Sequence, residues 1–226
     1  MNVKLITIVI YSLFLIILSS LMTVLFYHVF VFKTFSQEAE NNAAFFEVSS
    51  EKVLSSPIKE NNSIIEVLSY GCHYCSVLDD DISQFAKKLP EGVSFKATHL
   101  NINNGEGLSA YAPIFATLEE MGIESELRKV FYDAVINRKI SLTDQETLID
   151  FLKQYGIDTN EYLNVSQSKA VQDRLEEMEN ISKFYQITGT PAFIINKRYV
   201  VYQDKEFPEF SAYMLDLLNE SKQEKP

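Results

Sequence analysis

The chain has two parts that differ in how apolar and polar residues follow one another. Residues 5–32 contain no Lys, Arg, Asp or Glu and consist mostly of Leu, Ile, Val and Phe. A helix of roughly 20 apolar residues is long enough to cross a bilayer, whereas the apolar core of a cleaved secretory signal has about 7–15 residues. The pattern therefore predicts an uncleaved transmembrane anchor at 5–32, with a cleaved signal as the alternative, and a polar linker at 33–60. A short extended piece around Phe45–Val48 is expected to join the domain.

After residue 60, short β-branched or alternating apolar runs predict strands. The first two strands are expected on either side of a helix that ends at Lys87-Lys88, just before Pro90. The last two are expected to form a hairpin through residues 196–198. The four predicted strands are Ser63–Tyr70, Val93–Leu100, Ala192–Ile195 and Tyr199–Tyr202.

Between the second and third strands, apolar residues recur at the spacing of amphipathic helices. Residues 127–135 carry such a stripe, residues 143–146 have the form of a capping box, and a further helix is expected at about 165–185. A last helix is expected around residues 210–218. The order is β-α-β, a block of helices, then β-β-α, which predicts an α/β fold with an all-helical insertion at about 108–187.

The net charge argues against nucleic acid as a partner. The 226 residues include 20 Lys+Arg and 31 Asp+Glu, for a formal charge of −11. Residues 34–226 keep 18 of the basic residues and all 31 acids, so the part after the anchor carries −13. Binding of nucleic acid depends on clustered Lys and Arg. The length suits one domain, which we place at 61–226, in addition to the anchor.

The chemistry of the chain is expected at Cys72-His73-Tyr74-Cys75. Cys72 lies where a strand ends and a helix begins, and a helix N-terminus lowers the pKa of a thiol. Cys75 lies one helical turn further on the same face, so the pair can form a disulfide and open it by exchange. A protonated His73 would further favour the Cys72 thiolate.

Two other interpretations of the cysteine pair stay open at this point. Zinc requires four N or S ligands, and outside the apolar stretch the chain offers only His73 and His99 beside the two cysteines. A static disulfide that closes so short a loop would stabilise the fold little. Both interpretations are therefore less favoured than thiol–disulfide exchange, and we expect no bound metal.

The segment from Glu66 to Cys75 and the motif Gly189-Thr190-Pro191 before a strand resemble the DsbA family of thioredoxin-fold thiol–disulfide oxidoreductases. The similarity extends over about residues 62–219. The resemblance implies a thioredoxin-like fold that carries the helical insertion. It also implies a redox-active Cys72–Cys75 disulfide and no other cofactor.

The resemblance also implies roles for individual residues. Cys72 corresponds to the exposed nucleophile and Cys75 to the buried resolving cysteine. Pro191 corresponds to the cis-proline that faces the disulfide, and Thr190 to the residue whose backbone pairs with a substrate strand. Glu66 corresponds to a buried acid beneath the disulfide, whose pKa desolvation would raise; an exposed edge position is its alternative.

Four positions depart from the family pattern. His73-Tyr74 replaces the usual Pro-His dipeptide, so a strongly oxidising potential does not follow from the resemblance. Tyr74 and Thr190 are similar to the disulfide isomerase and reductase relatives DsbC and DsbG. Ala97 stands where the family often has a basic residue near the acid.

These features together predict a single-pass protein of the cell inner membrane with its catalytic domain in the periplasm. Its expected activity is the introduction of disulfides into reduced envelope proteins, with reoxidation by a DsbB-type membrane protein. The first alternative is an isomerase or reductase kept reduced by a DsbD-type donor. The second, of another class, is a membrane-tethered metal-binding or chaperone module.

Overall fold

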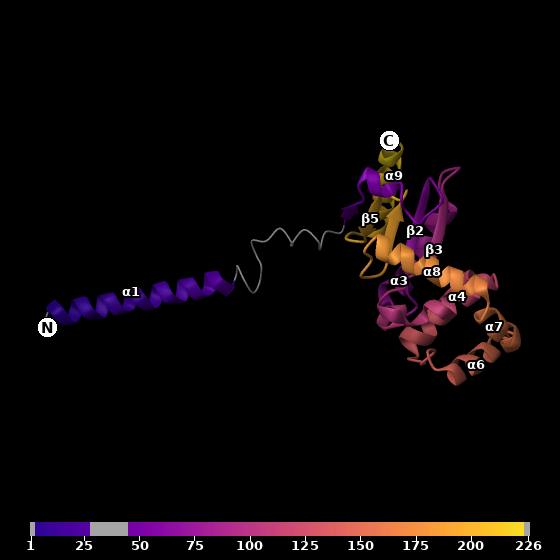
Figure 1. Cartoon of the computed structure of the whole chain (residues 1–226), viewed down its shortest axis with the longest axis horizontal. Coiled ribbons are helices and arrows are strands. Elements are labelled where there is room, and N and C mark those ends of the chain that lie inside the picture. Colours follow the sequence, from indigo (N-terminus) through magenta and orange to yellow (C-terminus); the bar gives the residue numbers. More distant parts are fainter. Residues whose placement is uncertain (1–2, 28–44, 224–226) are drawn as a thin grey trace. The chain divides into compact units, whose positions relative to one another are not determined.

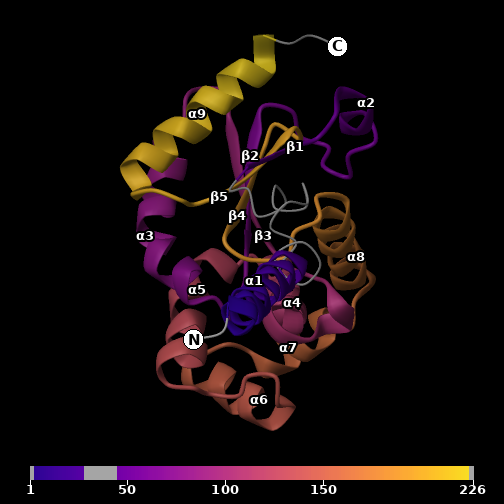
Figure 2. The ribbon, with the colours of Figure 1, turned by 90° about the vertical axis from the view of Figure 1, so that its left-hand side faces the viewer.

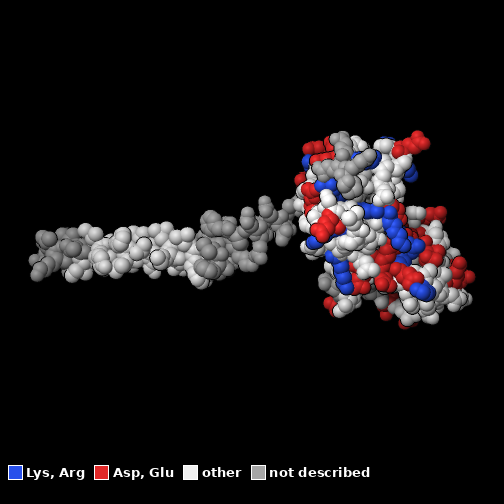
Figure 3. All heavy atoms as spheres, turned by 45° about the horizontal axis from the view of Figure 1, so that its top comes forward, with Lys and Arg blue, Asp and Glu red and all other residues white. Residues whose placement is uncertain are grey.

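The computed structural model describes residues 3–27 and 45–223, which belong to two separate units, 1–43 and 44–226 (Figure 1). In the first unit, α1 (Val3–Phe26) is a single helix. Its residues Ile8–Phe26 have a mean hydropathy of 2.5, and none of them is buried. Figure 3 shows no acidic or basic side chain over residues Ile8–Phe26 of this helix. Its length and composition allow it to cross a membrane, a test that a signal sequence also passes.

The second unit is built on a five-stranded sheet with the order β1-β5-β4-β2-β3. β2 and β3 are parallel, and the other pairs are antiparallel. The four strands predicted from the sequence are present, and a short strand joins them at the edge. The strands are β1 (Phe45–Glu47), β2 (Ser63–Leu68), β3 (Ser94–His99), β4 (Ala192–Ile195) and β5 (Tyr199–Tyr202).

The edge strand confirms the extended piece expected around Phe45–Val48 and shortens the predicted linker. β1 pairs with β5, and α2 (Ser50–Val53) follows it. Val48 and Ile58 are buried because they pack against the sheet. The folded unit therefore begins near residue 44, and the predicted domain start at residue 61 is too late. The first part of the predicted linker and the end of the predicted anchor lie outside the described residues.

Helices fill the chain between β3 and β4, as predicted. Two details differ from the sequence interpretation. The helix α6 is capped by Asp144, whose carboxylate accepts the N–H of Thr147, one residue later than a capping box starting at Thr143 would place it. The helix expected at about 165–185 is present but begins at Lys169, because Ser168 is its N-cap; Val165 belongs to the end of the preceding helix.

The helical elements that complete the unit include 3-10 turns at Asn103–Gly105 and Gly107–Tyr111 and a π-helical turn at Asp133–Asn137. The α-helices after α2 are α3 (His73–Lys87), α4 (Ala112–Glu120), α5 (Glu124–Tyr132), α6 (Gln145–Gln154), α7 (Thr159–Ser166), α8 (Lys169–Phe184) and α9 (Phe207–Gln223).

The sheet lies between two layers of helices, and the helical insertion packs below it (Figure 2). On one face, Ile64 and Phe193 pack against α3 and α9. On the other face, Ile65 and Ile194 pack against α8. The insertion has its own core, and Cys75 of α3 belongs to it. The start of α3 therefore lies where the sheet meets the insertion.

Candidate active site

The two cysteines form a disulfide at the start of α3. Cys72 is the N-cap residue of this helix, with extended φ and ψ of −92° and 112°. The Cα atoms of Cys72 and Cys75 are 5.3 Å apart. The backbone N–H of Cys75 donates to Cys72 Sγ at 3.0 Å. In the reduced protein, this N–H and the positive end of the helix dipole would stabilise a Cys72 thiolate.

The two cysteines differ in accessibility. Cys72 is 5% exposed, whereas Cys75 is fully buried in the core of the insertion. His73 and Tyr74, which lie between them, are both exposed. Because an incoming sulfur can reach only the more exposed atom, Cys72 is the cysteine that an external thiol would attack.

The loop before β4 faces Cys72. The Thr190–Pro191 peptide bond is cis, as the resemblance implied. The carbonyl oxygen of Thr190 lies 3.3 Å from Cys72 Sγ. This contact follows from the sheet, since β4 runs antiparallel beside β2, the strand that leads into Cys72. The fold therefore brings Thr190 and Cys72 together, although they are 118 positions apart in the sequence.

A groove of about 500 Å³ lies beside these residues. One wall is the exposed face of α3, and the other is the loop that joins β5 to α9. The residues that line it are Tyr74, Val77, Leu78, Thr190, Pro191, Tyr202, Gln203, Asp204, Lys205 and Glu206. A chain bound in this groove would pass directly next to Cys72.

A buried cluster of charges lies within the unit. Glu66 on β2 is 2% exposed, so the exposed alternative for this residue is excluded. Arg128 of α5 binds both carboxylate oxygens of Glu124, at 2.9 and 2.6 Å. Its guanidinium also lies 3.7 Å from Asp79 and 4.0 Å from Glu66. Three carboxyl groups thus surround one cation, so the cluster favours binding a proton.

Burial raises the pKa of Glu66 to about 7; the nearby Arg128 opposes this shift, and Asp79 and Glu124 reinforce it. One oxygen of Glu66 has no hydrogen-bond partner among the described residues. Asp79, whose pKa burial also raises, follows Cys75 by one helical turn on α3. Glu66 can therefore take up a proton near neutral pH, in a cluster whose other member Asp79 lies one helical turn from the buried Cys75.

Arg128 is a residue that the sequence analysis missed. Glu66 is paired in register with Ala97, the position where a basic residue was sought and not found. The cation comes instead from the helical insertion. The spacing of Glu124 and Arg128 was the available signal, but such i, i+4 pairs are usually exposed on a helix surface.

The titration of Glu66 predicts a pH-dependent stability. The carboxyl group has a pKa of 4.5 in the unfolded chain and of about 7 in the fold. The folded state therefore holds an extra proton between these values, and this stabilisation is lost as the pH rises through 7. A shift of this size corresponds to about 3 kcal/mol. Between pH 5 and pH 8, denaturant unfolding should show wild type losing about this much stability relative to Glu66→Gln.

The Glu66→Gln comparison also removes the effect of His99. Burial lowers the pKa of His99 to about 4, which acts in the opposite direction between pH 4 and 6.5 but is common to both proteins. Parallel pH profiles for wild type and Glu66→Gln would contradict the prediction.

His99 has a structural role in the fold. Its Nε2 accepts the N–H of Tyr70, and its Nδ1 donates to the carbonyl of Leu100. Both ring nitrogens are thus engaged. Within the residues that the structure describes, no group of three or more His, Cys, Asp or Glu side chains is arranged to hold a metal ion.

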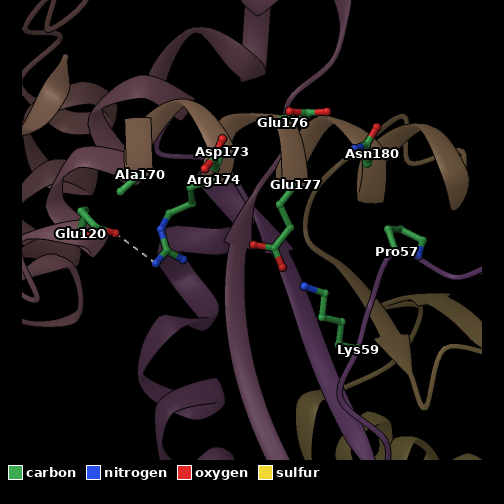
Figure 4. A pocket seen from close by; sticks show the side chains of 9 residues that line it. All are labelled: Pro57, Lys59, Glu120, Ala170, Asp173, Arg174, Glu176, Glu177 and Asn180. Carbon is green, nitrogen blue, oxygen red and sulfur yellow. Dashed lines mark hydrogen bonds and ion pairs between the residues drawn. The ribbon is translucent and has the colours of Figure 1, made fainter. Parts of the chain in front are cut away.

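A second hollow, of about 460 Å³, lies along α8 (Figure 4). Its Arg174 already pairs with Glu119 and Glu120, at 3.0 and 3.4 Å. None of its lining residues comes from the start of α3 or from the loop before β4. These residues are Pro57, Lys59, Glu120, Ala170, Asp173, Arg174, Glu176, Glu177 and Asn180.

A disulfide at a helix start, with one cysteine 5% exposed and the other fully buried, and a cis-proline in the facing loop before a neighbouring strand define a thioredoxin-fold thiol–disulfide oxidoreductase. A family model described as a DSBA-like thioredoxin domain matches residues 63–215. The chain belongs to this family.

The chain is similar to curated proteins of the same kind. The thiol:disulfide interchange protein DsbA of Pseudomonas syringae pv. tomato is 27% identical over 164 residues, which cover 73% of this chain and 75% of that protein. The DsbA of Pseudomonas aeruginosa strain PAO1 is 29% identical over 155 residues, covering 69% of this chain and 72% of that protein.

Solved structures confirm the predicted thioredoxin-like fold with its helical insertion. A crystal structure of Pseudomonas aeruginosa DsbA aligns with a TM-score of 0.67 and 25% identity over 80% of this chain and 93% of that one. A structure of its E82I variant aligns with a TM-score of 0.71 and 23% identity over 80% and 97% of the two chains.

Proposed function

We propose that this protein is a membrane-anchored oxidase that introduces disulfides into reduced envelope proteins in the periplasm. The observation that carries the proposal is the N–H of Cys75, which donates to Cys72 Sγ at the start of α3. This contact would stabilise the Cys72 thiolate, and a stabilised reduced form makes a disulfide a stronger oxidant. Thiol–disulfide exchange that oxidises the client and reduces the Cys72–Cys75 pair would then be favourable.

The proposed reaction proceeds through a mixed disulfide. A client thiolate attacks Cys72 Sγ, the bond to Cys75 Sγ breaks, and Cys75 leaves as a thiolate. A second client thiolate then attacks the client sulfur of the mixed disulfide and releases the Cys72 thiolate. Two electrons pass from the client dithiol, which becomes a disulfide, to the Cys72–Cys75 pair, which becomes a dithiol.

Three residues support these steps in our proposal. Glu66, with its pKa of about 7, provides the proton that the buried Cys75 thiolate takes up. Thr190 offers its backbone to an extended client segment, which would thereby lie beside Cys72. The exposed His73, when protonated, adds a positive charge next to the Cys72 thiolate.

The reduced enzyme must be reoxidised before it can act again. We propose a DsbB-type membrane protein as the oxidant, and no cofactor in this chain other than the redox-active disulfide. The helix α1 is proposed to remain as a single-pass anchor in the inner membrane, with the second unit in the periplasm. An oxidising compartment is where protein disulfides persist.

An isomerase or reductase is the second candidate, because Tyr74 and Thr190 match the pattern of those relatives. Such an enzyme must be kept reduced by a membrane donor. The two candidates therefore differ in the resting state of the cysteine pair.

Acid quenching of cells followed by thiol alkylation and immunoblotting tests the proposal. We expect a mostly oxidised Cys72–Cys75 pair, in a chain that migrates at its full mass of 25.9 kDa. A mostly reduced pair would favour the isomerase or reductase. A band of lower mass, reduced by the mass of the apolar segment, would show that α1 is a cleaved signal. A Cys72→Ser, Cys75→Ser double variant provides the unmodified reference band.

A further inference from the structure

The groove beside Cys72 is apolar on one side. Tyr74 and Val77 of α3 are 71% and 62% exposed and belong to the lining of the groove. Pro191 and Tyr202 add to the same lining. Large exposed apolar side chains that surround a hollow next to a reactive atom favour binding of an apolar side chain there.

The opposite rim of the groove is acidic. Asp204 and Glu206 line the groove and are exposed. In the described part of the chain, neither carboxylate takes part in an ion pair or an ordered side-chain hydrogen bond. Lys205 lies between them, but its ammonium is engaged elsewhere, 3.6 Å from Glu209 and 5.0 Å above the ring of Tyr213. Two unpaired negative charges therefore remain for whatever occupies the groove.

The overall negative charge of the protein also favours cationic segments. Residues 34–226 contain 18 basic and 31 acidic residues. A body of this charge attracts cationic segments and repels acidic ones, most strongly at low ionic strength. The acidic rim adds a local preference because it lines the same groove as Thr190, whose carbonyl oxygen lies 3.3 Å from the reacting sulfur.

We propose that the groove selects client segments that carry an apolar residue and a Lys or Arg close to the reactive cysteine. The apolar side chain packs between Tyr74 and Tyr202, and the basic side chain pairs with Asp204 or Glu206. This inference rests on the proposed function, because it requires exchange at Cys72. It adds the class of client that the site prefers.

Peptide oxidation by the full-length protein tests this selection. The oxidised protein is placed in phosphatidylcholine nanodiscs, whose lipids carry no net charge. The substrates are matched two-cysteine peptides that differ only in Lys or Glu at the second or third position on either side of the first cysteine. Because each exposed ion pair contributes modestly, we expect the best Lys peptide to be oxidised about 3 to 10 times faster than its Glu counterpart. The ratio should shrink as salt is added.

Two double variants identify the origin of the preference. Asp204→Asn with Glu206→Gln should reduce the Lys-to-Glu rate ratio to within about twofold. Glu146→Gln with Glu161→Gln changes the net charge equally, on exposed positions of α6 and α7, and should keep most of the ratio. An equal loss of the ratio in both variants would overturn the role of the rim.

The outcomes separate the inference from the proposed function. If wild type oxidises the Lys and Glu peptides at the same rate, the inferred selection is wrong and the oxidase function stands. If wild type oxidises none of the peptides, the proposed function is contradicted and the inference falls with it.

Discussion

Replacing Cys75 with serine should cause stable mixed disulfides between Cys72 and client proteins to accumulate. Cys72 is the more exposed of the two cysteines, and its thiolate can attack a client disulfide, which forms a mixed disulfide and expels the other client sulfur as a thiolate. In wild type, Cys75 Sγ lies one helical turn away and can attack Cys72 Sγ of a mixed disulfide that no second client thiol resolves, which re-forms the Cys72–Cys75 bond and expels the client thiolate. A serine hydroxyl cannot do this, so turnover should fall to background. Non-reducing gels of acid-quenched cells should show high-mass bands that disappear with dithiothreitol.

Cys72→Ser is the matched control for this experiment. It leaves one cysteine of the pair, but Cys75 is fully buried and should form almost no adducts. Equal amounts of adducts from both variants would contradict the assignment of Cys72 as the attacked residue. An absence of adducts from Cys75→Ser would argue against any exchange role and favour the ligand or chaperone module.

Replacing Arg128 with methionine should destabilise the folded domain by about 3 kcal/mol or more. Methionine keeps much of the apolar volume but removes the only cation that the described structure places among Glu66, Asp79 and Glu124. Loss of one partner from a buried ion pair leaves uncompensated charge, which typically costs about 3–5 kcal/mol. Denaturant unfolding of wild type and variant at pH 8 measures the difference.

Lys129→Met is the control, because it removes the neighbouring cation of the same helix. Lys129 pairs with Asp80 at the exposed surface, where ion pairs contribute little. The penalty of Arg128→Met should also shrink at pH 5, where protonation of Glu66 relieves the remaining charge. Equal effects of the two substitutions, or a penalty that does not change with pH, would contradict the proposed role of Arg128.

Local patterns in the sequence were sufficient for much of the fold. The strands Ala192–Ile195 and Tyr199–Tyr202 were predicted with the bounds that the structure shows, since short apolar runs around a turn depend on neighbouring residues. The start of α3 at the cysteine pair was predicted for the same reason. Contacts between segments that are far apart in the sequence leave weaker patterns in it. β1 is only three residues long, and its strand character depends on pairing with β5.

The sequence by itself determined the chemistry of this protein: two cysteines one helical turn apart at a helix start, and a proline before a strand. Its resemblance to a known family placed that proline opposite the disulfide. Only the tertiary structure decided that Arg128, from the insertion, is the cation near Glu66, and that Asp204 and Glu206 line the same groove as Thr190 and Pro191. The physical reason is that the first set depends on spacing along one helix or strand. The second set depends on how separate elements pack, which no local periodicity encodes.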